Sequence, residues 1–340
     1  MGRLIFTWLA VRFQWNNTAM TGPQTKSKRL TNFATWFKAL VGLNESRSTH
    51  AQSKVWVVMA VLSLALIFIG HSLGRFGLLF GFMLALSVNT LVFFYADFRL
   101  STLFPGQELE GQDAWGLIRQ TRELARSMGV HVPTLVLIHS TTPLAFSAGL
   151  LPHHSRIYLS DELLKRLSND EIRIVLAYEL HRLKTQQTSA ATAASALVGL
   201  LTFTARIIDD VLLFRWAFAL LPGARARQEN LLRHSGILLG PMTLLVSPFV
   251  ALLVRLSISR RALIESDHAA GEITAAGNGS VARTLWKLDS YAKTRPFPVN
   301  LAEAHLFTVS PLTRYPMWRF ASAQPPIEAR LKALTGFEPL

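Results

Sequence analysis

The sequence predicts an α+β membrane protein that begins with a pair of transmembrane helices. Hydrophobic residues make up 50% of the 340 residues and charged residues only 16%, whereas soluble domains carry roughly 25% charged residues. Two apolar segments of about 20 residues each stand in the first third of the chain, and a mixture of strand and helix patterns follows them. These observations favour a membrane anchor followed by a mixed domain outside the bilayer.

The two apolar segments are residues 55–73 and 76–96, and the second contains no charged side chain. Each is close to the roughly 20 residues that cross the hydrocarbon core of a bilayer. Only Gly74 and Arg75 separate them, so we predict a transmembrane helical hairpin over residues 55–97. The apolar surface of this hairpin makes the lipid bilayer the first expected partner.

Residues 1–54 form a basic N-terminal extension in which Glu45 is the single acid. By the positive-inside rule, this extension places both outer ends of the hairpin in the cytoplasm. The segment is either an amphipathic anchor at the membrane surface or disordered, and its sequence leaves both open.

The net charge of +14 and the pI of about 10.7 are compatible with a protein that binds nucleic acid. No basic motif with interleaved aromatic residues supports that interpretation, so we expect anionic lipid and no nucleic acid as the partner of this charge. The chain has no cysteine, which excludes disulfides and cysteine-based zinc sites.

Residues 98–189 have the pattern of a soluble α+β segment. The expected elements are a helix over 111–128, a strand over 134–138, a hairpin of strands 145–150 and 156–159, a helix capped by Ser160 or Asp161, and a longer helix capped by Ser168 or Asn169. Apolar character returns over residues 190–258, which hold either two spans or one span with interfacial helices. Residues 259–340 are polar again.

Several motifs follow one another in an order typical of one family. They are T-P-L-A-F-S-A-G at 142–149, Y-E-L-H-R at 178–182, S-R-R at 259–261 with Asp267, H-L-F at 305–307, and P-P-I-E-A-R-L at 325–331. This order resembles the HtpX family of membrane zinc metallopeptidases, within the CAAX prenyl protease/HtpX superfamily, over about residues 55–334. The resemblance implies a zincin-like peptidase domain, split into residues 98–189 and 259–340 by the membrane helices of 190–258.

The chemistry of that family needs the motif H-E-x-x-H. Two histidines one helical turn apart bind Zn²⁺, the glutamate acts as general base, and a later glutamate is the third ligand. Here Tyr178 stands at the first histidine position, Arg182 at the second and Leu263 at the third ligand. Arginine has no lone pair to offer a metal, so we expect no metal and no zinc cofactor although the family uses one.

The remaining site residues are assigned from the same resemblance. Glu179 is a vestigial general base, Asp267 and His181 are supporting residues, and Gln324 replaces a histidine before the Pro-Pro pair. The strand that would bind a peptide by strand addition consists of Ala145, Phe146, Ser147 and Ala148, preceded by Leu144 in place of an asparagine.

Three alternatives concern individual side chains. Arg182 either neutralises Glu179 and Asp267 in a buried network or forms an exposed pair with Glu179. A shifted metal site would use His181, Glu265 or His268. His153 and His154 lie in a predicted turn, where exposure to solvent is expected.

The predicted function is that of an HtpX-like membrane pseudopeptidase, a scaffold, complex subunit or substrate- or partner-binding regulator in membrane protein quality control. Two alternatives are a residual zinc metalloendopeptidase with rearranged ligands and a purely structural subunit. The predicted location is the bacterial inner membrane, with the peptidase-like domain in the cytoplasm and a membrane or cytoplasmic protein as partner. Whether the chain forms an oligomer stays open.

Overall fold

The computed structural model describes residues 51–209 without 112 and 114, residues 241–311 without 298 and 300, and residues 324–337. All of these belong to the unit Ser46–Leu340. The predictions for residues 1–50, and for residues 210–240 within the second apolar region, lie outside the described residues.

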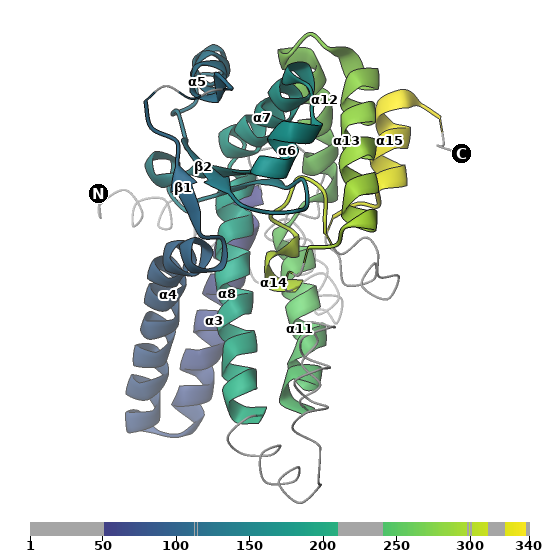
Figure 1. The fold of residues 1–340 in the computed structure, drawn as a ribbon. Helices are drawn as coiled ribbons and strands as arrows, with labels where there is room; N and C mark the ends of the chain where they lie inside the picture. The colour runs from purple at the N-terminus through teal and green to yellow at the C-terminus, as the bar shows by residue number, and fades with distance from the viewer. Residues whose placement is uncertain are drawn as a thin grey trace, which may run out of the picture. The chain divides into compact units, whose positions relative to one another are not determined.

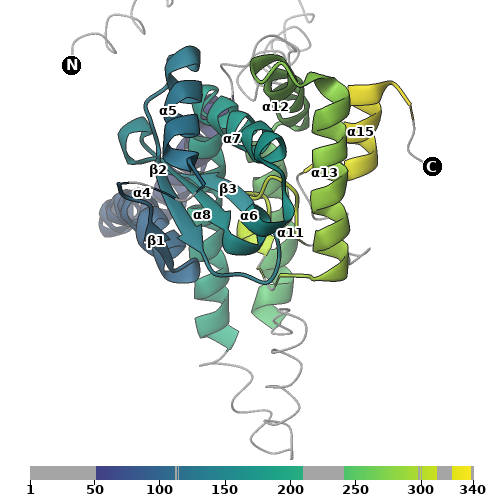
Figure 2. The ribbon, with the colours of Figure 1, turned by 45° about the horizontal axis from the view of Figure 1, so that its top comes forward.

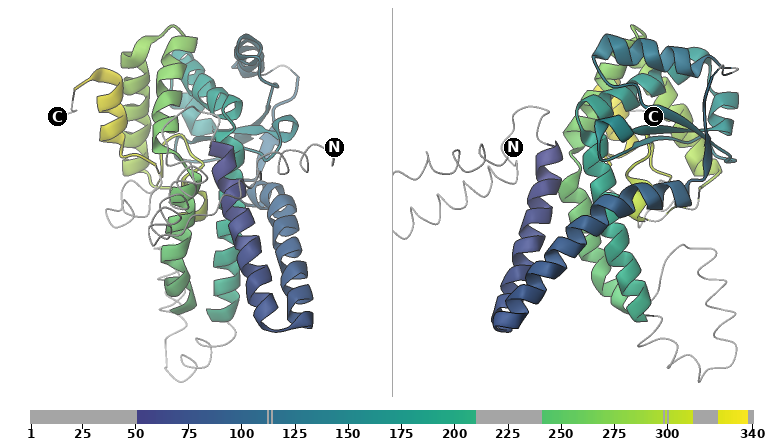
Figure 3. Two further views of the ribbon diagram at one scale, coloured as in Figure 1. Left: turned by 180° about the vertical axis from the view of Figure 1, so that it is seen from behind. Right: turned by 90° about the vertical axis from the view of Figure 1, so that its left-hand side faces the viewer.

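The two predicted N-terminal helices are α3 (Ala51–Ser72) and α4 (Arg75–Leu103), and they pack against each other as an antiparallel pair (Figure 3). Gly74 joins them with a φ of 90°, a backbone conformation that glycine adopts without a steric penalty. Helix α4 continues past the predicted end of the hairpin at residue 97, because the first helix-breaking residue on this side is Pro105.

Small residues bring these two helices close together. A Cβ atom on Gly81 would lie 2.6 Å from the carbonyl oxygen of Leu66 on the facing helix, so only glycine fits there. Further along the pair, the Asn89 Nδ2 donates a hydrogen bond of 2.8 Å to the Ser63 Oγ. Close backbone approach and one polar contact therefore fix how α3 and α4 pack.

Helices α8 (Gln187–Ile208) and α11 (Pro241–Ser257) pack against this pair and, like it, extend away from the sheet (Figure 1). Among the described residues, two helical segments have the length and composition to cross a membrane, Arg75–Val92 and Gln187–Ile208. The apolar segments Trp56–Ser72 and Leu245–Arg255 are shorter.

The sheet has four strands in the order β1-β2-β4-β3. Strands β2 (Thr134–Ile138) and β4 (Arg156–Ser160) are parallel, and β3 (Ala145–Ala148) pairs antiparallel with β4, as the predicted hairpin requires. The short 3-10 helix η2 (Pro152–His154) lies in the turn between them. Strand β1 (Gly106–Glu108) was not predicted, because its three residues are all exposed and show no alternation. Strand β3 therefore stands at one edge of the sheet.

The helices next to the sheet begin at the predicted caps. The Ser160 side chain caps α6 (Asp161–Arg166), and Ser168 caps α7 (Asn169–Lys184) in a reciprocal capping box with Glu171. Helix α5 (Leu117–Met128) begins later than residue 111 because the Asp113 carboxylate accepts hydrogen bonds from the first backbone N–H groups of the helix.

The C-terminal part supplies the remaining helices, α12 (Arg260–Ile273), α13 (Gly277–Thr294), α14 (Leu301–Ala304) and α15 (Ile327–Thr335). Helix α13 packs against α12, α15 and α7, and Figure 2 shows α13 and α15 side by side. Apolar side chains of α7, including Leu176 and Leu180, lie in one core cluster with Leu263 of α12 and Leu331 of α15. The described residues form the predicted mixed α and β structure, and α7 stands at its centre.

Candidate functional site

Helix α7 carries the three residues predicted to stand at the H-E-x-x-H positions of the resembled family. Tyr178, Glu179 and Arg182 are all buried, and the exposed fractions of Glu179 and Arg182 are 0% and 1%. Burial of two charged side chains is costly unless each finds a partner. The partners of Glu179 and Arg182 therefore define what this site can do.

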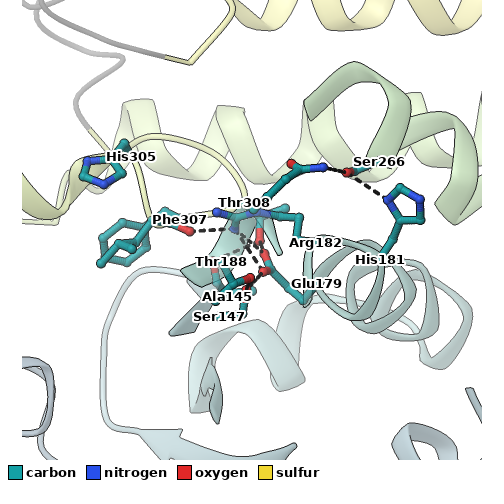
Figure 4. Close-up of polar contacts among 12 residues, drawn as sticks. Ala145, Ser147, Glu179, His181, Arg182, Thr188, Ser266, His305, Phe307 and Thr308 are labelled. Carbon is teal, nitrogen blue, oxygen red and sulfur yellow. Dashed lines mark hydrogen bonds and ion pairs between the residues drawn. The ribbon is translucent and has the colours of Figure 1, made fainter. Parts of the chain in front are cut away.

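The Glu179 carboxylate accepts hydrogen bonds on both oxygens (Figure 4). Its Oε2 accepts from the Ser147 Oγ at 2.6 Å and from the Arg182 Nη1 at 3.0 Å. Its Oε1 accepts from the Thr308 Oγ1 at 2.6 Å and from the same Arg182 nitrogen at 3.4 Å. Strand β3, helix α7 and the segment after α14 thus all converge on one carboxylate.

The predicted buried pair between Arg182 and Glu179 is confirmed. The direct partner of Asp267 among the described residues is Arg330 of α15 and not the predicted Arg182, although the charge of Arg182 still favours the ionised form of Asp267. Arg330 donates from Nε at 2.8 Å and from Nη2 at 2.5 Å to the two oxygens of Asp267. Burial on its own lowers the pKa of Arg330, but its interactions with Asp267, Tyr178 and Glu179 together outweigh burial and raise the pKa.

Tyr178 lies between these two ion pairs. Its ring centroid is 5.8 Å from the Cζ of Arg182 and 5.4 Å from the Cζ of Arg330, within the range of cation–π attraction. Its hydroxyl has no hydrogen-bond partner among the described residues. Burial raises the pKa of Tyr178 to about 12, so the side chain is a neutral phenol at physiological pH.

Leu263 and His181 are placed differently from the charged residues. Leu263 is buried in the same apolar cluster as Tyr178, on helix α12, whose first turn is capped by the Ser259 side chain. His181 points away from Glu179 and toward Ser266, with the Nδ1 and Oγ atoms 3.0 Å apart (Figure 4). Burial and the charge of Lys184 lower the pKa of His181.

Metal-binding groups are absent from the described ranges, where no three histidine, aspartate or glutamate side chains lie close enough together to hold an ion. His181, Glu265 and His268 thus form no such group. His153 and His154 are exposed, as the turn predicts, and the ring of His153 contacts that of His131 at a centroid distance of 4.9 Å.

The strand predicted to bind peptide, Ala145–Ala148, is buried along its whole length. On the side of β3 away from β4, Phe146 forms an antiparallel bridge with Phe307. The Thr308 N–H donates to the Ala145 carbonyl at 2.9 Å. Peptide binding at this strand stays a prediction, and the strand already contacts a segment of the same chain.

Gln324 turns toward that same segment. Its Nε2 donates to the Phe307 carbonyl at 2.5 Å and to the His305 carbonyl at 3.2 Å. Leu144, predicted to replace the family's asparagine, uses its backbone N–H to donate to the Ser160 Oγ at 2.8 Å. Both residues therefore act here in backbone contacts.

Three polar residues of the site were not predicted as site residues: Thr188, Thr308 and Arg330. Thr188 lies 2.7 Å from the Ser147 Oγ and extends the network of hydroxyls around Glu179. The two threonines carry no sequence signal, because their roles depend on contacts between residues far apart in the chain. Arg330 lies within the C-terminal motif, and its place in that motif is the signal that would have identified it.

Comparison with known proteins identifies similar chains. The chain is 32% identical over 284 residues to a protease HtpX homolog of Pelotomaculum thermopropionicum, a match that covers 83% of this chain and 98% of the relative. It is 31% identical over 281 residues to a protease HtpX homolog of Syntrophobacter fumaroxidans, covering 82% and 96%. A homolog from Thermococcus sibiricus is 29% identical over 280 residues, covering 82% and 93%.

Among solved structures, the chain is similar to the crystal structure of Ste24p from S. mikatae. That match has a TM-score of 0.45 and 17% sequence identity, and covers 83% of this chain and 67% of the other. No family model matches the sequence.

Proposed function

The chain belongs to the HtpX protease family, and from that premise we propose that it is an integral membrane pseudopeptidase that holds no catalytic zinc. Its role is that of a non-catalytic scaffold or complex subunit in membrane protein quality control. The observation that carries this proposal is the pairing of the buried Glu179 with Arg182, Ser147 and Thr308.

The residues at the family's ligand positions do not fit zinc. Zinc sites in proteins use imidazole nitrogen, thiolate sulfur or carboxylate oxygen. Tyr178 offers a neutral phenol because its pKa is raised to about 12, and the Arg182 guanidinium has no lone pair to give. Leu263 is apolar and packed in the core. A cation placed here would also face the positive charge of Arg182.

Glu179 is equally unsuited to act as a general base. A base needs an accessible oxygen within hydrogen-bond reach of the proton it takes. Both oxygens of Glu179 already accept short hydrogen bonds from side chains, and the carboxylate is 0% exposed. The carboxylate that would activate water in a peptidase serves here to neutralise an arginine.

Membrane insertion is supported by the apolar surface of the long helices. Large apolar side chains of α3 and α4 are exposed, among them Phe68, Phe76 and Phe94 at 75%, 89% and 71%. Such a surface is unfavourable in water and suits the acyl chains of a bilayer. The basic residues 1–54 favour the cytoplasmic side for the outer ends of this pair, in the inner membrane of a bacterium.

Proteolysis of casein by the purified full-length protein tests the proposal. With zinc supplied, we expect no cleavage above the buffer control, and no difference between the wild type and Glu179→Gln. Thermolysin under the same conditions is the positive control. Casein cleavage by the wild type would overturn the proposal, and its loss in a Glu179→Gln variant that circular dichroism shows to be folded would assign the cleavage to this carboxylate.

A further inference from the structure

We infer that residues 306–308 form an internal strand that occupies the edge of β3, held there by Arg182 and Gln324. The inference rests on the proposed function, because it assigns a structural task to residues that would otherwise bind zinc or substrate. It concerns how the peptide-binding edge is closed. Residues 306–308 are called the internal strand.

The first observation is the pairing itself. Strand β3 has one partner, β4, within the sheet, so its other edge is the one open to strand addition. Phe307 forms an antiparallel bridge with Phe146 at that edge. The Thr308 N–H donates to the Ala145 carbonyl at 2.9 Å. An incoming peptide would need the same carbonyl.

The second observation is a run of four backbone carbonyls that each accept a hydrogen bond from a side chain. Gln324 donates to His305 at 3.2 Å and to Phe307 at 2.5 Å, Arg182 to Leu306 at 2.8 Å, and Arg330 to Thr308 at 2.7 Å. Side-chain donors on α7, on α15 and just before α15 thus fix the segment along its length. A segment that only lay near the sheet would not need a side-chain hydrogen bond to each of four consecutive carbonyl groups.

Two of these three donors stand at positions where the resembled family has histidine. An imidazole has one N–H in its neutral form, whereas the Gln324 amide directs its nitrogen toward two carbonyls at once. The Arg182 guanidinium contacts both the Leu306 carbonyl and Glu179 through a single nitrogen. Both replacements therefore add donors for the internal strand, and the one at Arg182 also removes a predicted metal ligand.

The side chains of the internal strand anchor it further. The Phe307 ring is 1% exposed and packs against Phe146 at 4.8 Å and Phe104 at 5.7 Å between ring centroids. The Thr308 hydroxyl reaches Glu179 at 2.6 Å (Figure 4). Displacing the internal strand would expose the Phe307 ring and break the hydrogen bond to the buried Glu179 carboxylate. The internal strand is therefore held stably at the edge of β3.

The consequence is that an extended polypeptide cannot pair with Ala145 and Phe146. A partner protein must then contact another surface, which favours a structural subunit over a regulator that binds peptides in this groove. Arg182 and Gln324 are positioning residues for the internal strand.

Hydrogen exchange of the full-length protein in detergent, followed by mass spectrometry, tests this inference. We expect slow exchange in the fragments that contain residues 145–148 and 306–308. Gln324→Met keeps the side-chain length without the donor, and should speed exchange in both fragments at least tenfold while leaving 134–138 unchanged. Gln107→Ala, at an exposed position of β1, is the matched control and should change neither fragment.

Fluorescein-labelled casein provides a second measurement that does not depend on any variant. Addition of the wild-type protein should not change the fluorescence anisotropy of the labelled casein. Addition of casein should not alter hydrogen exchange at residues 145–148. Fast exchange at 306–308 in the wild type, equal exchange in Gln324→Met, or casein binding that protects 145–148 would overturn the inference. Zinc measured in the same samples separates the two claims, because bound zinc contradicts the proposed function, whereas fast exchange without zinc contradicts only the internal strand.

Discussion

Arg182 follows Glu179 by one turn of α7, and its Nη1 donates to the Glu179 Oε2 at 3.0 Å with both side chains buried. Arg330 and Asp267 form a second buried pair beside it. Two cations thus balance two anions around Tyr178, and the site is electrically neutral without a metal. Buried charges persist only when they are paired in this way, so the pairing explains how the site stays folded.

Removal of Arg182 should destabilise the protein strongly. Arg182→Met would leave the buried Glu179 carboxylate with two hydroxyl partners among the described residues, and an uncompensated buried charge costs about 3–5 kcal/mol. Unfolding of the purified protein in detergent, followed by circular dichroism, measures the loss of free energy.

The double variant Arg182→Met with Glu179→Gln is the control for that prediction. It removes both charges, so we expect it to recover much of the stability that the single variant loses. Equal destabilisation of the single and double variants would mean that packing, and not charge, accounts for the effect.

Tyr178→Phe should leave stability unchanged or raise it by about 1 kcal/mol, because it removes a buried hydroxyl without a hydrogen-bond partner among the described residues and keeps the ring between the two guanidinium groups. Tyrosinate absorbance supplies a second readout. One tyrosine of the wild type should ionise near pH 12, and that step should be missing in Tyr178→Phe. A stability loss of several kcal/mol in this variant would indicate an unseen partner of the hydroxyl.

The pKa of His181, which burial and Lys184 lower, predicts how stability changes with pH. Histidine in an unfolded chain titrates near 6.5, so below about pH 6.5 the unfolded chain binds more protons than the folded protein. The free energy of unfolding should therefore decrease as the pH falls below that value. Thermal unfolding between pH 7.5 and 5 measures the decrease, which should be smaller in His181→Gln.

Glu272 offers a matched test of the same effect. The negative charge of Glu272 raises the pKa of His181, whereas the two larger causes, burial and the charge of Lys184, lower it. Glu272→Gln should therefore lower the pKa further and steepen the loss of stability at acid pH. A shallower pH dependence in this variant would show that His181 is not the group responsible.

The close contact between α3 and α4 predicts that one added methyl group at Gly81 destabilises the protein. Gly81→Ala would place a Cβ atom 2.6 Å from the Leu66 carbonyl, so the helices must separate, and overpacking of this kind costs about 1–3 kcal/mol. Gly279→Ala in α13 is the control, since a Cβ atom there meets nothing within 4 Å. The control should be neutral or slightly stabilising, whereas Gly81→Ala should lower the unfolding temperature in detergent.

Much of the fold follows from local sequence signals. The apolar segments predict α3 and α4, and the serine caps predict where α6 and α7 begin. Strand β1 was missed because three exposed residues form it, and only its pairing with β2 holds it in the sheet. Such an element depends on its neighbour and has no pattern of its own.

Contacts of the candidate site within helix α7 could be predicted from the sequence, whereas contacts between different helices and strands could not. The spacing of Glu179 and Arg182 on one helix allows the ion pair to be foreseen. The partner of Asp267 was predicted wrongly, because Arg330 comes from a helix 63 residues later and sequence spacing does not measure that distance in space. The contacts of residues 305–308 with Gln324 and Arg182 are likewise set by tertiary packing.

The zinc content of the full-length protein, purified from cells grown with zinc and measured by inductively coupled plasma mass spectrometry, tests the central claim most directly. The triple variant Tyr178→His, Arg182→His and Leu263→Glu, which rebuilds the family's ligand set, is the comparison. We expect well below one zinc per chain in the wild type and a clear gain in the triple variant if it folds. About one zinc per chain in the wild type, retained through dialysis against buffer, would contradict the account.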